Sequence, residues 1–246
     1  MNFSFLTDDS EKSLAPVFSA PVIAAMVQSL VIVCGLVLLF WPRGPLFAYI
    51  GTSSGPLLFF QTFSVILILQ SYMNLRCGRG EMMKGDFTHS FKKEVSTHEK
   101  EMHFLRYAGF LFVAQTLFIL FPFLPILMLA SAVSGISALG FIQAVSMLYV
   151  TVFLCRLFGF FAYLIWGRDS VAGYLLVRGF AVFYLLATVG FAPAVNPLKM
   201  IYELNKKGQQ PGPFLYYTAA SLFVVFVLII VNTLLVNRHI KMERSA

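Results

Sequence analysis

The sequence predicts an all-α, polytopic membrane protein in which six transmembrane helices form a single domain over residues 1–246. Three observations lead to this fold class. Hydrophobic residues make up 59% of the chain and charged residues only 12%, against about a quarter charged in soluble domains. The apolar residues gather in six runs, each long enough to cross about 30 Å of hydrocarbon. The charges gather in one block between the second and third runs.

The six runs have the length of membrane-spanning helices and lack the alternating polarity of β-barrel strands. They lie near residues 22–41, 57–73, 105–130, 139–161, 171–191 and 214–236. Pro122 and Pro125 interrupt the third run, which predicts a kink or an early end there. The first run follows Asp8, Asp9 and Glu11. A cleaved signal peptide has a positively charged start instead, so we expect this run to stay in the membrane.

The distribution of lysine and arginine predicts the orientation of the helices. Six crossings place both termini on one side, together with the 76–106 block and the turn at 167–170. That side collects most of the basic residues, and the opposite side has only Arg43, Lys199, Lys206 and Lys207. Basic loops stay in the cytoplasm, so both termini are predicted to be cytoplasmic. The same rule accounts for the net charge of +7 without a nucleic-acid partner.

The charged block at residues 76–106 is where we expect the chain to meet a soluble partner. It holds seven Lys/Arg, five Asp/Glu and three of the four histidines. Within it an apolar stripe recurs at helical spacing, formed by Phe91, Val95, His98, Met102 and Leu105. This pattern predicts an amphipathic cytoplasmic helix between the second and third spans. Its stripe could lie on the membrane surface or press against the partner.

A second interrupted segment, at residues 192–213, lies on the predicted outer side. Pro193 and Pro197 would end the fifth helix, and apolar residues then recur up to Leu204 among three lysines. A short amphipathic helix at the outer interface and a solvated loop both fit this pattern.

The chain lacks the motifs of the common enzyme classes. It has no P-loop, so ATP would not bind by that route. His98 and Glu99 begin a sequence like the H-E-x-x-H zinc helix, but the next histidine, His103, is five residues on. Two imidazoles at that spacing lie about 140° apart around a helix and cannot share a metal ion. The sequence therefore predicts no enzymatic activity, no cofactor and no metal.

Two charges fall inside predicted spans. Arg156 lies in the fourth run and Arg178 about two turns into the fifth. Intramembrane charges commonly mark functional sites, although both arginines could also snorkel to the cytoplasmic interface. Asp169, in the turn between the two runs, could pair with either of them.

Four segments resemble one family of transport proteins. Residues 11–41 contain KSLAPVFSAP just before the first run, and residues 67–84 read LILQSYMNLRCGRGEMMK. Residues 167–204 and the basic end VNTLLVNRHIKMERSA continue the likeness. Together they resemble the permease subunits of ABC-2-type transporters, of the gliding-motility type. In that family's "M-R…G-T-x-E-x-L-L" passage, Arg76, Glu81 and the pair Met82-Met83 match. Arg79 and Gly80 replace the usual Gly and Thr, and no Pro follows Glu81 where a "T-P-x-S" turn is usual.

The resemblance implies a transport mechanism and a set of partners. Two permease copies or homologues would form the pathway in the cell's inner membrane, in contact with its lipids. Separate cytoplasmic ABC ATPase subunits would hydrolyse ATP, and the direction would be export. The coupling segment would be the 76–106 block, and the residues in contact with the ATPase would be Arg76, Glu81, Met82, Phe87, Phe91, Lys92 and Lys93. A membrane scaffold that docks a cytoplasmic partner without transporting anything is the alternative.

Overall fold

A computed structural model describes residues 20–40, 55–81, 112–167, 170–207 and 211–244 of the chain. All the regular structure in these ranges is helical, which confirms the predicted all-α class. The first half comprises α2 (Ala20–Phe40), α3 (Gly55–Gly78), helical residues 112–120, a 3-10 turn (Phe121–Phe123), α6 (Leu124–Val133) and α7 (Ala138–Trp166). The second half comprises α8 (Val171–Val182), a π-helical turn (Phe183–Ala187), α9 (Thr188–Phe191), a 3-10 turn (Pro193–Val195), α10 (Pro197–Lys207) and α11 (Pro211–Arg244).

Five helical segments within the described ranges are long and apolar enough to cross a membrane. They are Ala20–Leu39, Leu57–Gly78, Phe112–Val133, Ala138–Trp166 and Phe214–Arg238. Each coincides with one of the predicted runs, so the chain is a multi-pass membrane protein. The predicted fifth run corresponds to a shorter apolar helix, Val171–Leu186, which a π-helical turn widens before the chain changes direction.

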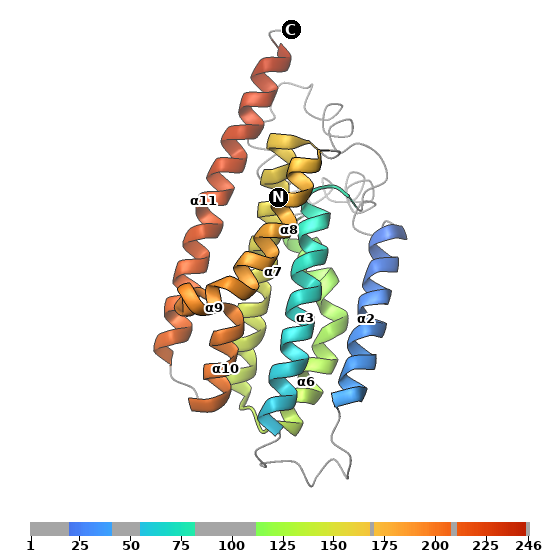
Figure 1. The fold of residues 1–246 in the computed structure, drawn as a ribbon, viewed down its shortest axis with the longest axis vertical. Helices are drawn as coiled ribbons and strands as arrows, with labels where there is room; N and C mark the ends of the chain where they lie inside the picture. The colour runs from blue at the N-terminus through green and yellow to red at the C-terminus, as the bar shows by residue number, and fades with distance from the viewer. Residues whose placement is uncertain (1–19, 41–54, 82–111, 168–169, 208–210, 245–246) are drawn as a thin grey trace, which may run out of the picture.

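The long helices stand side by side, with α3 and α7 in the middle of the bundle (Figure 1). In Figure 1, α2 and α11 flank the bundle on opposite sides. Both outer helices expose rows of large apolar side chains, such as Leu38 and Leu39 on α2 and Phe223 and Phe226 on α11. Such surfaces suit contact with lipid.

Two glycines let α3 and α7 touch backbone to backbone. A Cβ added to Gly78 would lie 2.1 Å from the Arg156 carbonyl oxygen. A Cβ added to Gly159 would lie 2.3 Å from the Leu75 carbonyl oxygen. No side chain fits at either place, and small residues at such crossings are typical of helix packing in membranes.

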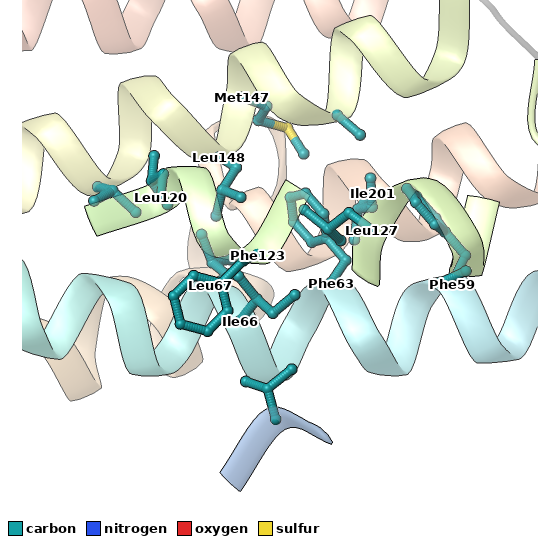
Figure 2. Close-up of a cluster of buried hydrophobic side chains, with 14 of the residues drawn as sticks. Phe59, Phe63, Ile66, Leu67, Leu120, Phe123, Leu127, Met147, Leu148 and Ile201 are labelled. Carbon is teal, nitrogen blue, oxygen red and sulfur yellow. The ribbon is translucent and has the colours of Figure 1, made fainter. Parts of the chain in front are cut away.

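The largest apolar core lies between α3, α6 and α7 (Figure 2). Phe59, Phe63, Ile66 and Leu67 line one face of α3, and Ile201 of α10 closes one end. The opposing side chains come from the other helices and are Leu120, Phe123, Leu127, Met147 and Leu148.

Pro122 and Pro125 do not end the third run. Pro122 lies in the 3-10 turn and Pro125 in the first turn of α6. The N–H groups in the first turn of a helix have no partner within that helix, so a proline there removes few helical hydrogen bonds. The chain thus stays helical through a 3-10 interruption to Val133.

The segment after the fifth run folds into α10, which confirms the amphipathic-helix alternative for residues 197–207 and makes the solvated loop wrong there. Asn196 organises this region. Its Nδ2 donates to the carbonyl oxygens of Tyr184 and Leu185, in the π-helical turn, and to Thr188 Oγ1 at 2.7 Å. Its Oδ1 accepts from the Lys199 N–H at 2.9 Å and so caps α10.

Candidate functional site

The end of α3 turns sharply just where the charged block begins. The Gly80 N–H donates to the Cys77 carbonyl oxygen, and the Glu81 N–H donates to the Arg76 carbonyl oxygen. Gly80 has φ of 73°, in the left-handed region that glycine adopts without strain. Gly80 stands where the permeases that the sequence resembles carry Thr, and the turn it forms brings the Glu81 carboxylate back over its own helix.

Glu81 accepts ion pairs from three arginines. Its Oε2 lies 3.0 Å from Arg76 Nε and 3.6 Å from an Nη of Arg178, and its Oε1 lies 3.1 Å from an Nη of Arg79. We call these four side chains, with Tyr72 and Tyr174, the Glu81 cluster. The cluster joins α3 to α8, which are distant in sequence.

Arg79 makes the tightest connection between the two helices. It is buried, and one Nη donates to the Ser170 carbonyl oxygen at 2.6 Å. The Ser170 hydroxyl in turn accepts from the Gly173 N–H and caps the start of α8. The end of α3 is therefore fixed to the beginning of α8.

Arg178 lies about two turns after the start of α8, and its side chain extends to the cluster. Its guanidinium stacks on the Tyr174 ring, with Cζ 3.2 Å from the ring centroid, and donates to Tyr72 Oη at 3.3 Å. The side chain bends toward the start of its helix, where Glu81 lies. Arg178 therefore extends away from the middle of its helix, as the snorkelling hypothesis predicts.

Arg156 behaves differently, because its side chain is 2% exposed and lies among three helices. One Nη donates to Asn74 Oδ1 at 3.1 Å and to Thr116 Oγ1 at 3.3 Å, and the other donates to Gln115 Oε1. Its guanidinium also lies over the Phe112 ring. We call this group the Arg156 site. The snorkelling hypothesis is wrong for Arg156.

The polar groups around Arg156 are all neutral. Asn74 donates its own Nδ2 to the Gln70 carbonyl oxygen, which leaves Oδ1 to face the guanidinium. The Thr116 hydroxyl donates to the Phe112 carbonyl oxygen, so a lone pair of its Oγ1 faces the guanidinium in the same way. Among the residues that the structure describes, no carboxylate lies within ion-pair distance of Arg156, and its buried Nε has no hydrogen-bond partner. A charge held in this way inside a membrane is costly, and its retention points to a function.

Only part of the predicted site falls within the described residues. Arg76 and Glu81 are there and are 3.0 Å apart, and Arg156 and Arg178 sit in two separate sites. The remaining predicted positions lie outside the described residues, and they are Met82, Phe87, Phe91, Lys92, Lys93 and Asp169, together with His98 and His103.

Sequence reasoning missed the roles of Arg79, Asn74, Gln115 and Thr116. In the sequence Arg79 stood out only as a departure from the motif of the permeases that the chain resembles. A usable signal was present, because Gln115 is an amide within the third apolar run and Asn74 directly follows the second, and buried amides need partners.

No family model, curated protein or solved structure matches this chain. The function must therefore be inferred from the residues and their geometry.

Proposed function

We propose that this chain is the permease subunit of an ATP-driven ABC transporter of the ABC-2 type, working as an exporter. Two copies, or a copy and a homologue, would form the pathway in the inner membrane. Separate cytoplasmic ATPase subunits would supply the energy. The sequence resemblance supports this proposal, and so does the way in which the charged block is anchored.

The observation that carries the proposal is that the start of the charged block, and the helical segment that begins at residue 112 after it, are tied to other helices through arginines. At its start, Glu81 is ion-paired with Arg178 of α8, and Arg79 is hydrogen-bonded to Ser170 just before α8. Just after it, Gln115 and Thr116 accept hydrogen bonds from Arg156 of α7. A partner that displaced the block would therefore exert force on α3, α7 and α8 at the same time.

This arrangement suits coupling between ATP hydrolysis and a change in the membrane. ATP-driven closure of the ATPase subunits can bias the permease only if the two permease states differ in their contacts with the ATPase. Because the helices on either side of the block are tied to α7 and α8, a displacement of the block outside the membrane would become relative movement of packed helices. Such small helix shifts are a common form of switching transition.

The topology that we propose has six crossings with both termini in the cytoplasm. The starts of α2 and α8, together with the ends of α3, α7 and α11, lie toward one end of the bundle (Figure 1). The fifth crossing would be the broken one, made by α8 and the π-helical turn, with α10 at the outer interface. The positive-inside rule assigns the end that holds the Glu81 cluster to the cytoplasm.

The position of Glu81 inside the cluster changes the role that we propose for it, which the sequence had predicted to be a contact with the ATPase. Its side chain is only 15% exposed and faces three arginines. We therefore propose that Glu81 anchors the coupling segment, while residues further along the block, such as Phe91 and Lys92, touch the ATPase.

Co-purification of the full chain from membranes of its source cells tests the proposal. We expect a soluble P-loop ATPase to accompany the chain and to hydrolyse ATP. Phe91→Asp should reduce this association, whereas Glu203→Gln, in an i,i+4 pair on α10, should leave it unchanged. Each variant is first compared with the wild type in its size-exclusion profile.

Two results would contradict the permease proposal. Recovery of the intact chain without any ATPase would overturn it directly. Recovery of a cytoplasmic partner that hydrolyses no nucleotide would favour the scaffold instead.

A further inference from the structure

The outward face of the Glu81 cluster has the chemistry of a phospholipid site. Arg76 and Arg178 approach the same carboxylate oxygen, Oε2 of Glu81, at 3.0 and 3.6 Å. Both side chains remain partly accessible, at 36% for Arg76 and 23% for Arg178. Among the described residues, Arg76 donates a hydrogen bond only from Nε, so its two Nη groups are available to a ligand.

The charge balance at this face favours an anion. Arg76 and Arg178 bring two positive charges to an oxygen of one carboxylate, which also contacts Arg79. A phosphodiester carries one negative charge. Paired guanidinium groups bind phosphate oxygens in a bidentate manner better than lysines do.

On α3 the residues below Arg76 change in the order in which a phospholipid changes, and on α8 an aliphatic residue lies below Arg178. On α3, Ile68, Tyr72 and Arg76 follow one another at i, i+4 and i+8, all at least partly exposed. On the adjacent α8, Val182 and Tyr174 flank Arg178 at the same spacing and are exposed. Each stripe carries an aliphatic, an aromatic and a cationic side chain.

The two tyrosines fit the interfacial region between head group and acyl chains. Tyr72 is 38% and Tyr174 is 44% exposed, and both rings are also in contact with Arg178. Tyrosine and arginine are enriched at this depth, where a ring has one apolar side and one wet edge.

We propose that Arg76 and Arg178 bind the phosphate of an anionic phospholipid of the cytoplasmic leaflet, with Tyr72 and Tyr174 beside its glycerol region and Ile68 and Val182 beside its acyl chains. This site goes beyond transport and needs only that the chain lies in a membrane. Basic surfaces between transmembrane helices at the cytoplasmic side bind anionic head groups in general.

Native mass spectrometry of the full chain in detergent tests the site, with phosphatidylglycerol and phosphatidylcholine as probes. The wild type should bind phosphatidylglycerol in preference. Arg76→Gln and Arg178→Gln should each weaken that binding by roughly fivefold. Arg238→Gln removes the same charge from an exposed position near the end of α11 and serves as the matched control.

Arg76→Lys keeps the charge but loses the bidentate geometry, so it should bind phosphatidylglycerol more weakly than the wild type and more tightly than Arg76→Gln, which separates loss of the site from loss of the fold. Equal binding of phosphatidylglycerol by wild type and both glutamine variants would overturn the proposal. So would an equal loss in Arg238→Gln, which would mean a general charge effect. A large excess of inorganic phosphate that displaced the lipid completely would assign the site to a free anion instead.

Discussion

The Glu81 cluster and the Arg156 site accommodate arginine in opposite ways, although both involve the last turns of α3. In the Glu81 cluster three arginines share one carboxylate at the end of the bundle. In the Arg156 site one guanidinium faces neutral oxygens from Asn74, Gln115 and Thr116 among three helices. The first arrangement compensates charge with charge, and the second solvates charge with dipoles.

The difference separates stability from function. An ion pair with good geometry at an interface can hold two helices together, so the Glu81 cluster is expected to stabilise the fold. A guanidinium that is buried without a counter-charge gains little for the fold, because the cost of removing it from water offsets its hydrogen bonds. We therefore expect a substitution of Arg156 to affect function more than stability.

Replacing Gly78 should have the largest effect, because it disturbs both sites at once. In Gly78→Ala the new Cβ would meet the Arg156 carbonyl oxygen at 2.1 Å, so α3 must move away from α7. That movement pulls Asn74 from Arg156 and Arg79 from Ser170. We expect a loss of about 3 kcal/mol in the free energy of unfolding, measured by denaturation in detergent.

Gly35→Ala is the matched control, since a Cβ at Gly35 on α2 meets nothing within 4 Å. Similar stability of the two alanine variants would show that α3 and α7 do not cross as described.

Removing the carboxylate of the Glu81 cluster should have the next largest effect. Glu81→Gln leaves buried Arg79 and half-buried Arg178 without this charged partner. We expect a loss of about 2 kcal/mol in the free energy of unfolding. Glu203→Gln removes a carboxylate from the Lys199–Glu203 pair, 3.0 Å apart, and should cost under about 0.5 kcal/mol. Equal losses in the two variants would mean that the Glu81 cluster does not join α3 to α8.

Arg76→Gln should have the smallest effect on stability within the cluster. The Arg76 side chain is 36% exposed, so solvent screens its pair with Glu81. We expect a loss under about 1 kcal/mol, which should shrink further as salt is raised in thermal unfolding experiments. A loss as large as that of Glu81→Gln would place Arg76 in the interior of the cluster, contrary to its exposure.

The apolar runs were readable because hydropathy over about 20 residues decides which segments enter a membrane. Five of the six predicted runs correspond to long apolar helices, with ends that differ by a few residues. The fifth was harder, because its break depends on Asn196, which bonds back to the carbonyl oxygens of Tyr184 and Leu185 eleven or twelve residues away. No pattern among neighbouring residues in the sequence predicts a hydrogen bond between residues that far apart.

The candidate site was predictable only in part. Glu81 and the two intramembrane arginines stand out in the sequence, because charges are rare in or beside apolar runs. Their partners did not, since whether Arg178 meets Glu81 or Asp169 depends on how α3 and α8 pack. Arg156 is buried so deeply because Gly78 and Gly159 allow α3 and α7 to approach closely. A hydropathy pattern does not contain this information.

ATP hydrolysis by the Arg156→Met chain, in complex with the ATPase that the permease proposal expects to co-purify with it, tests most directly the claim that Arg156 serves a function. Methionine fills a similar volume without charge but leaves the oxygens of Asn74, Gln115 and Thr116 without this donor, so we expect a loss of about 1–2 kcal/mol in the free energy of unfolding. ATP turnover per folded complex should fall by about tenfold, while Glu203→Gln should retain it. Unchanged turnover in a folded Arg156→Met complex would contradict the account.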